Sequence, residues 1–318
     1  MNELNITQET DTSVLSNAAS VAQFELNVYN RKKLITLIGE FHTHTYDCNS
    51  GTRKTVTEYC INRLDSNPKC NLLLEYNEKM CDKHLIGSDI IKDIFGKEDY
   101  KQYHGRVFGV DNRCDMLSED DKVGQKKQQT LYQSSPKKFF GAFDHEAIKS
   151  SYLSNFNSKN LENNIRNDQQ GGQLHRYVNT LKAQKDQLGV MMDETIKRNE
   201  NMLQELRRFW ANVMDFEVLK QIIYSDDKAN EIVVVIGQYH QINLFKVFTE
   251  LYSLKPIRGT DHYAVNESSK IKCINIGNLK KVQSTEEMLE EITKVFPDVF
   301  NTPNSKTKPQ TRRPTIRK

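Results

Sequence analysis

The chain has 318 residues, of which 37% are hydrophobic and 27% are charged, and its mean hydropathy is −0.70. A chain of this length can bury a substantial core, and its apolar runs all fall short of the roughly 18 residues that a membrane-spanning helix needs. The amino terminus is polar and acidic, unlike a secretory signal. We therefore expect a soluble intracellular protein without a membrane partner.

The cysteines and the charges narrow the function classes further. Six cysteines are scattered without a Cys-x-x-Cys pair, so we expect free thiols rather than disulfides or a zinc module. The net charge is +3, but residues 306–318 alone carry +6, which leaves −3 for the rest of the chain. By charge, only this basic tail is suited to contact nucleic acid or an acidic protein. The tail could instead direct the chain to the nucleus, whereas a cytoplasmic location is otherwise expected.

The first part of the chain predicts alternating strands and helices. Residues 1–24 lack hydrophobic periodicity, so we expect a disordered N-terminal segment there. Residues 34–38 form a short apolar run before Gly39, which is typical of a strand buried on both faces. The elements expected next are a helix at 52–64, a strand at 71–75, a weaker helix at about 79–95 and a strand at 106–111. This alternation predicts right-handed β-α-β units.

The second part begins with a long helical stretch. From 144 to 225 apolar residues recur at steps of three and four, which predicts amphipathic helices with a break at Gly189. The remaining elements expected are a strand at 231–237, a helix at about 242–253, a strand at 271–276 and a helix at 285–295. We therefore expect one α/β domain at 25–298. It would contain a mostly parallel central sheet, flanking helices and a helical insertion at about 145–225, and a flexible basic tail would follow at 299–318.

Polar side chains follow several of the predicted strands. The first strand ends in Gly-Glu-Phe-His at 39–42 and a later one in Gly-Gln-Tyr-His at 237–240, while Glu75 ends the second strand. The third ends in Asp111, with Arg113 two residues on. Because ligands bind at the carboxyl ends of parallel strands, the repeated Gly-x-x-His pattern predicts one shared site. Its expected members are Glu40, His42, Glu75 and His240.

Two imidazoles and two carboxylates suit hydrolysis in either of two ways. The side chains of Glu40, His42, Glu75 and His240 could bind a divalent metal ion that lowers the pKa of a bound water to about 7. Nitrogen and oxygen ligands favour manganese, cobalt, zinc or iron for that role. Alternatively, one histidine could act as a general base that a glutamate orients, without a metal. The sequence leaves both open.

These motifs, together with Arg-Asn-Glu-Asn-Met at 198–202, stand in the order found in a known superfamily. Over roughly residues 33–253 the chain resembles the erythromycin esterase, ChaN, TraB and Tiki superfamily. The resemblance implies an α/β core with a helical insertion and metal-dependent cleavage of a peptide or ester bond in a peptide or small molecule. It also implies that Arg198 reaches the site and stabilises a developing oxyanion. Because we expect no targeting segment, the chain departs from the secreted or membrane-tethered members, which argues against an extracellular peptidase.

Two other functions stay open. His42 and His44 form a His-x-His pair, and Gly-Thr-Asp-His follows at 259–262. Both resemble motifs of the polymerase-and-histidinol-phosphatase (PHP) phosphoesterases, which implies a multi-metal site of His42, His44, Glu75 and Asp261 or His262. The third interpretation is a non-catalytic interaction module whose long helices bind a partner, with Glu40 and His42 only capping strands.

Overall fold

The computed structural model of the chain places strands and helices in an α/β arrangement. It describes residues 14–16, 18–40, 53–77, 90, 94, 98–163, 165–167, 169–194, 200–225, 228–260, 273–275 and 289–290. A six-stranded sheet has the order β6-β5-β7-β3-β2-β8, and a smaller three-stranded sheet has the order β4-β1-β9. The α/β class expected from the sequence is confirmed at this level.

Parallel strands form the centre of the larger sheet. Its strands are β2 (Ala18–Val28), β3 (Arg31–Glu40), β5 (Cys70–Leu74), β6 (Val107–Gly109), β7 (Glu231–Gly237) and β8 (Arg258–Gly259). β7 pairs in parallel with both β3 and β5, and β5 pairs in parallel with β6. β2 and β8 are antiparallel. Every residue of β7 is buried, which explains its continuous apolar sequence.

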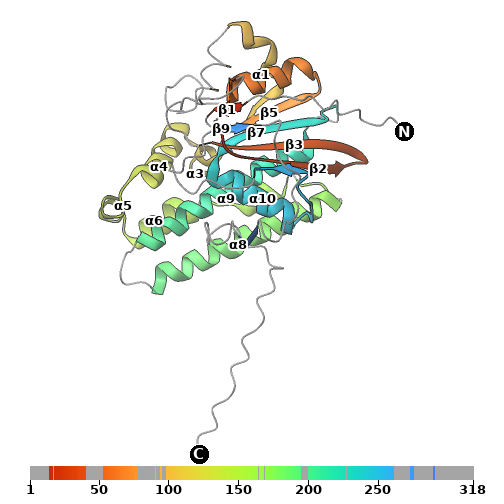
Figure 1. Cartoon of the computed structure of the whole chain (residues 1–318). Helices are drawn as coiled ribbons and strands as arrows, with labels where there is room; N and C mark the ends of the chain where they lie inside the picture. Colours follow the sequence, from red (N-terminus) through yellow and green to blue (C-terminus); the bar gives the residue numbers. More distant parts are fainter. Residues whose placement is uncertain are drawn as a thin grey trace, which may run out of the picture.

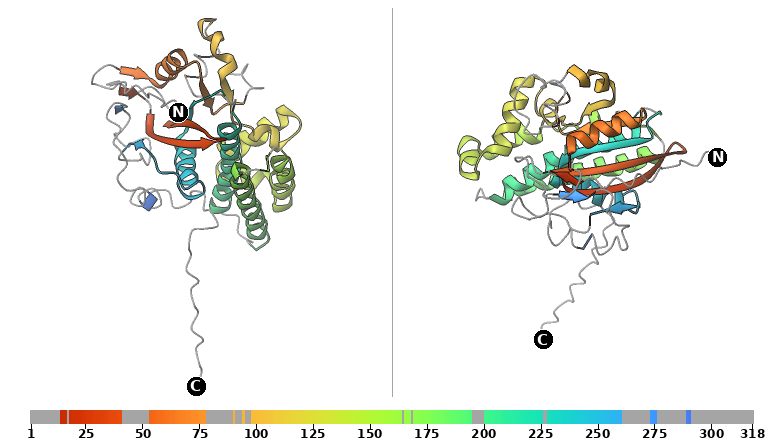
Figure 2. Two further views of the ribbon diagram at one scale, coloured as in Figure 1. Left: turned by 90° about the vertical axis from the view of Figure 1, so that its right-hand side faces the viewer. Right: turned by 45° about the horizontal axis from the view of Figure 1, so that its top comes forward.

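Helices cover both faces of this sheet, as Figures 1 and 2 show. On one face lies α1 (Val56–Ser66), which begins with a capping box formed by Thr55 and Glu58. On the other face lie α8 (Gln169–Glu194), α9 (Glu200–Tyr224) and α10 (Gln238–Glu250). Alternate residues of β7 face the two helical layers. Val233 packs with α1, and Val234 packs with α9 and α10.

The described residues between β6 and β7 are mostly helical, and the helices begin well before residue 145. They are α3 (Arg113–Leu117), α4 (Asp121–Gln133), α5 (Pro136–Ala142), α6 (His145–Ile148), the short π-helix η3 (Lys149–Leu153), α7 (Ser158–Glu162), α8 and α9. The break expected at Gly189 was wrong, since α8 continues through that residue. A glycine inside a helix costs about 0.5–1 kcal/mol, which the packing of α8 on α9 offsets.

The expectation of disorder was also wrong for residues 14–16, which form the strand β1 (Val14–Ser16), and for residues 18–24. Residues 18–24 belong to β2, which pairs with β3 from Ala18 to Val28. From residue 22 onward apolar and polar residues alternate, and the apolar ones are buried. The first residues of β2 are small and buried, so they do not show this alternation. Tyr29 and Asn30, with φ of 50° and 63°, form the tight turn into β3.

The smaller sheet joins segments that are far apart in the sequence. Its strands are β1 (Val14–Ser16), β4 (Arg53–Thr55) and β9 (Cys273–Asn275). β9 is the strand expected at 271–276, and the helix expected at 52–64 begins only at Val56 because β4 precedes it. The helices expected at about 79–95 and at 285–295 lie almost entirely outside the described residues, and the basic tail lies wholly outside them.

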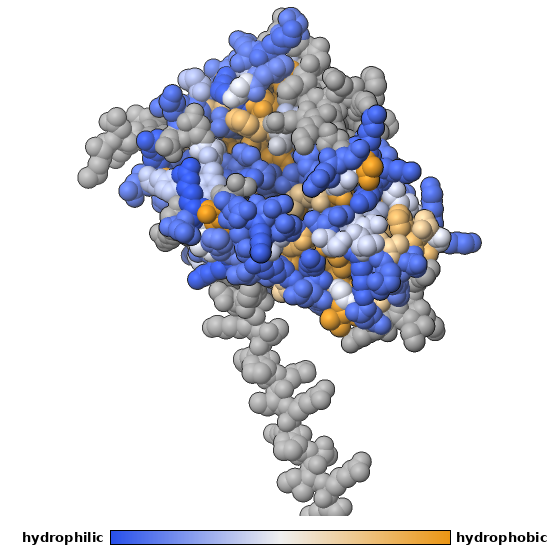
Figure 3. All heavy atoms as spheres, turned by 180° about the vertical axis from the view of Figure 1, so that it is seen from behind, coloured by the Kyte–Doolittle hydropathy of each residue, from blue (hydrophilic) through white to orange (hydrophobic). Residues whose placement is uncertain are grey.

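The described surface has no long apolar helix and few large apolar side chains. None of the described helices is both long and apolar enough to span a membrane. Figure 3 shows a mainly hydrophilic face with separate hydrophobic spots. The large hydrophobic residues that are exposed come from different segments of the chain: Tyr29, Val123, Val190 and Ile257. Such scattered residues are normal for a protein surface.

Candidate active site

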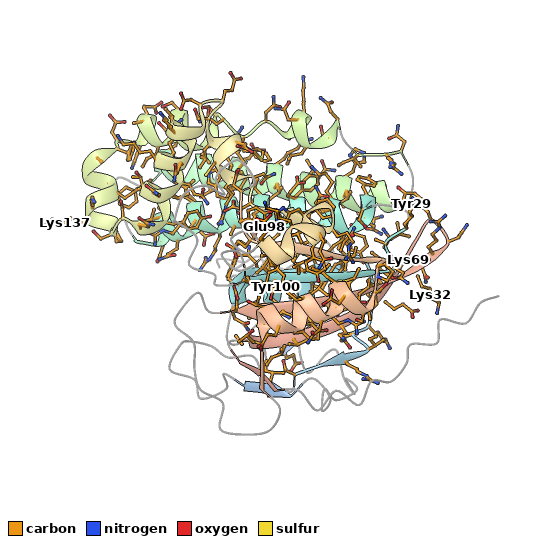
Figure 4. All side chains as sticks on the ribbon, turned by 90° about the horizontal axis from the view of Figure 1, so that it is seen from above. Tyr29, Lys32, Lys69, Glu98, Tyr100 and Lys137 are labelled. Carbon is orange, nitrogen blue, oxygen red and sulfur yellow. The ribbon has the colours of Figure 1, made fainter. Side chains whose placement is uncertain are left out.

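Polar side chains meet where the parallel strands end. Figure 4 labels Tyr29, Lys32 and Lys69 at the opposite end of the sheet, where the parallel strands begin. At the carboxyl end, Glu75 directly follows β5 and Gly237 ends β7. Because β5 and β7 are paired neighbours, Glu75 lies beside the start of α10. The expected meeting of Glu75 and His240 is therefore seen.

His240 lies in the first turn of α10 and contacts two carboxylates. The helix begins at Gln238, directly after β7, so the second Gly-x-x-His motif is a helix start rather than an extended strand end. Nδ1 of His240 lies 2.7 Å from Oδ1 of Asp215 on α9. Nε2 lies 3.6 Å from Oε1 of Glu75. The imidazole, with 8% of its side chain exposed, is held between these two acids.

Glu75 is fixed by donors at both of its oxygens. Oε2 accepts a hydrogen bond of 2.7 Å from the backbone N–H of Gly237. Oε1 accepts one of 3.1 Å from Nη2 of Arg113. Arg113 also donates to both oxygens of Asp111, each at 2.8 Å, and its guanidinium lies 4.9 Å from the ring centre of Tyr132. Arg113 is therefore part of the site.

The charges of these groups shift one another's pKa. Burial acts to lower the pKa of His240, but the nearby carboxylates of Asp215 and Glu75 outweigh it, and the net shift is upward. Burial acts to raise the pKa of Asp111, but the Arg113 guanidinium outweighs it and holds this pKa below its usual value. The surroundings of His240 therefore favour its protonated form, the imidazolium.

Asp215 is the functional candidate that the sequence did not reveal. It is fully buried in α9, where Val213, Met214 and Phe216 are its buried neighbours. Buried charges are nearly always paired, so a single carboxylate inside an apolar helix stretch was the available signal. That signal could not identify His240 as its partner, because the packing of α9 against α10 was unknown.

Glu40 and Glu75 leave the sheet on opposite faces. Glu40 shares its side of β3 with Ile38, which packs with α1, and its charge contributes to the raised pKa of Cys60 on that helix. Glu75 continues the side of Leu73, which packs with α9. Other expected site residues lie outside the described residues: His42, His44, Arg198, Asp261 and His262.

The described residues fit a metal ion poorly. Among them, no group of three or more His, Cys, Asp or Glu side chains is arranged to hold one. Both oxygens of Glu75 already accept hydrogen bonds, and the positive charge of Arg113 lies 3.1 Å from one of them. A guanidinium so close to a ligand oxygen would repel a divalent cation.

The two Gly-x-x-His motifs also contact each other directly. A Cβ atom on Gly39 would come within 2.2 Å of Oε1 of Gln238, so the glycine leaves room for this side chain in its present position. The Ser20 hydroxyl on β2 lies 2.8 Å from Oε1 of both Gln238 and Gln241. The glycine of the first motif thus makes space for the second, which brings the carboxyl end of β3 against the start of α10.

The chain was compared with models of protein families, with curated proteins and with solved structures, and no match was found. The resemblance to the erythromycin esterase superfamily therefore stays a prediction from short motifs. The geometry of the described residues carries the functional argument instead.

Proposed function

We propose that this chain is a hydrolase of ester or peptide bonds in which His240 is the general acid–base. The observation that carries the proposal is a buried imidazole with Nδ1 on one carboxylate and Nε2 facing another. An imidazole held in this way by Asp215 has a fixed orientation and a fixed tautomer. The convergence of α9, α10, β5 and α3 on this one point also supports a functional site.

The proposed reaction uses the Nε2 atom of His240. In its neutral form, His240 takes a proton from a water molecule as that water attacks the substrate carbonyl. Asp215 and Glu75 stabilise the imidazolium that forms, because both carboxylates lie close to its ring nitrogens. The imidazolium then gives the proton to the leaving oxygen or nitrogen. Arg113 and the Gly237 N–H hold Glu75 in place throughout.

The sequence resemblance adds the substrate class and two further residues to the proposal. It favours a peptide or a small ester as substrate, with His42 beside His240 and Arg198 stabilising the oxyanion. It also implies a divalent metal, which we do not include in the mechanism because Glu75 is already engaged by Arg113. The PHP-like alternative is less well supported, since the described strands of the larger sheet form an open sheet rather than a closed barrel.

A substrate screen with and without metal tests this proposal. The full chain would be treated with a chelator, or loaded with manganese, cobalt or zinc, and assayed on ester, peptide and phosphoester substrates. We expect hydrolysis of an ester or peptide to persist after chelation and to fall about 10²–10⁴-fold in His240→Gln. Val247→Ala, a core change further along α10, serves as the control that keeps its activity.

Two results would count against the proposal. Absence of turnover on every substrate class, with and without each metal, would contradict a hydrolase and favour an interaction module. Metal-dependent phosphoester hydrolysis that is lost in His44→Ala would favour the PHP-like alternative, because His44 has no role in the proposed reaction.

A further inference from the structure

The contact between His240 and Asp215 continues into a pair of buried asparagines. The side-chain amide of Asn243 donates through Nδ2 to Oδ2 of Asp215. The same Nδ2 donates to Oδ1 of Asn212 at 3.1 Å. Asp215 and Asn243 are fully buried, and Asn212 is 2% exposed. Burying amides and a carboxylate together is unfavourable unless each is hydrogen-bonded, and here the contacts are made.

These four residues form two facing pairs on two helices. His240 and Asn243 are three residues apart on α10 and share a face, as do Asn212 and Asp215 on α9. Each oxygen of the Asp215 carboxylate therefore has its own partner on α10, with His240 at Oδ1 and Asn243 at Oδ2. A carboxylate held at both oxygens cannot rotate away from the imidazole without breaking a buried hydrogen bond.

We propose that Asn243 and Asn212 are positioning residues that hold the Asp215 carboxylate and so fix the His240 ring. Asn243 uses one N–H on Asp215 and the other on Asn212, which sets the orientation of its amide. The inference rests on the proposed function, because the ring orientation matters for catalysis only if His240 transfers protons.

Asn212 is itself held by α8, which links the helical region to the site. Its Nδ2 donates to Oε1 of Gln184 at 3.1 Å, and its backbone carbonyl accepts a bond of 3.0 Å from the hydroxyl of Tyr177. A continuous set of polar contacts therefore runs from α8 through α9 and α10 to the imidazole. In this way the helices between β6 and β7 orient His240, which lies where β7 joins α10.

The test follows the proton on Nδ1 of His240 by NMR of the full chain labelled with ¹⁵N-histidine. The chain has eight histidines, and the signal is assigned by its loss in His240→Gln. Asn243→Leu replaces the amide by an apolar side chain of similar size. We expect this proton to exchange with solvent about tenfold faster or more, because a hydrogen bond to a buried charge is lost. Val247→Ala should leave the exchange rate unchanged.

Two outcomes decide the matter without a substrate. Exchange at the wild-type rate in folded Asn243→Leu would overturn the positioning role. If that variant does not fold, Asn212→Ala removes the acceptor that orients Asn243, together with the donor to Gln184, and leaves Asn243 itself in place. It should give a smaller acceleration, and an unchanged rate there would overturn the proposal equally. If exchange is faster in these variants but the wild-type chain has no hydrolytic activity, the positioning role is supported and the hydrolase proposal is contradicted. The failure of one proposal can therefore be told from the failure of the other.

Discussion

At the scale of single residues, side chains of opposite charge alternate across the candidate site. Asp215 is followed by the His240 imidazolium, then by Glu75, Arg113 and Asp111, and each neighbouring pair is in contact or within 3.6 Å. In a buried place such an order keeps every charge next to an opposite one. Removal of either cation, His240 or Arg113, leaves a buried carboxylate without its opposite charge, so these two substitutions are expected to have large effects.

For His240 we predict a pH-dependent contribution to stability. Its pKa is higher in the folded chain than the ordinary value of 6.5. The histidine therefore contributes stability that is fully present below about pH 6.5 and is lost as the pH rises through the folded pKa. Chemical denaturation of wild type and His240→Gln at several pH values should show a difference that shrinks above pH 6.5. A difference that grows with pH would contradict the assignment.

Replacement of Arg113 by methionine should destabilise the chain strongly. Arg113 is buried and neutralises Asp111 and Glu75, so Arg113→Met should cost about 3–5 kcal/mol of the free energy of unfolding. Lys32→Met breaks an exposed pair with Glu25, whose side chains are 58% and 38% exposed, and should cost about 0–1 kcal/mol. Urea denaturation compares the two, and equal losses would show that the Arg113 network is not a buried one.

The sequence predicted part of this site for a clear reason. Glu75 and His240 directly follow apolar strands, and strand ends of a parallel sheet meet at one edge. Asp215 lies inside a helix, where neither spacing nor composition specifies the partner across the helix interface. The separation of Glu40 from Glu75 also needed the structure, because it depends on the exact ends of β3 and β5.

At the scale of elements, the strand β2 was missed and its role can be tested. Phe24 is fully buried and packs against Phe245 and Phe248 of α10, with ring centres 5.4 and 5.2 Å apart. Phe24→Ala should therefore cost about 3–5 kcal/mol, measured by chemical denaturation. Val190→Ala, whose side chain on α8 is 53% exposed, should stay within about 0.5 kcal/mol. A neutral Phe24→Ala would mean that β2 is not part of the core.

The close approach of β3 and α10 gives a second test at this scale. In Gly39→Ala the new Cβ would meet Oε1 of Gln238 at 2.2 Å, so we expect a loss of about 1–3 kcal/mol from overpacking. Gly189→Ala on α8 meets nothing within 4 Å and should stabilise the helix by up to about 1 kcal/mol. Thermal unfolding of both variants checks the sign, and a neutral Gly39→Ala would argue against this contact.

The order of the strands could not be predicted at the scale of the whole molecule. Apolar runs indicated β3, β5, β6 and β7 because each is a short, strongly hydrophobic segment. Nothing in those runs specifies that β7, the last of them, inserts between β3 and β5. This insertion is what brings His240 next to Glu75, since β7 carries α10 directly to the end of β5. The long helix α9, which lies on the same face of the sheet as α10, then supplies Asp215.

The pH dependence of kcat/KM for the best substrate of the screen, in wild type and in Asp215→Asn, tests the central claim most directly. We predict that the wild-type rate rises with pH through the raised pKa of His240, because the neutral imidazole is the base. In Asp215→Asn the maximal rate should fall about 10²–10⁴-fold, and the rise should move to lower pH. Identical rates and identical profiles in the two proteins would contradict the assignment of His240 and Asp215 as the catalytic pair.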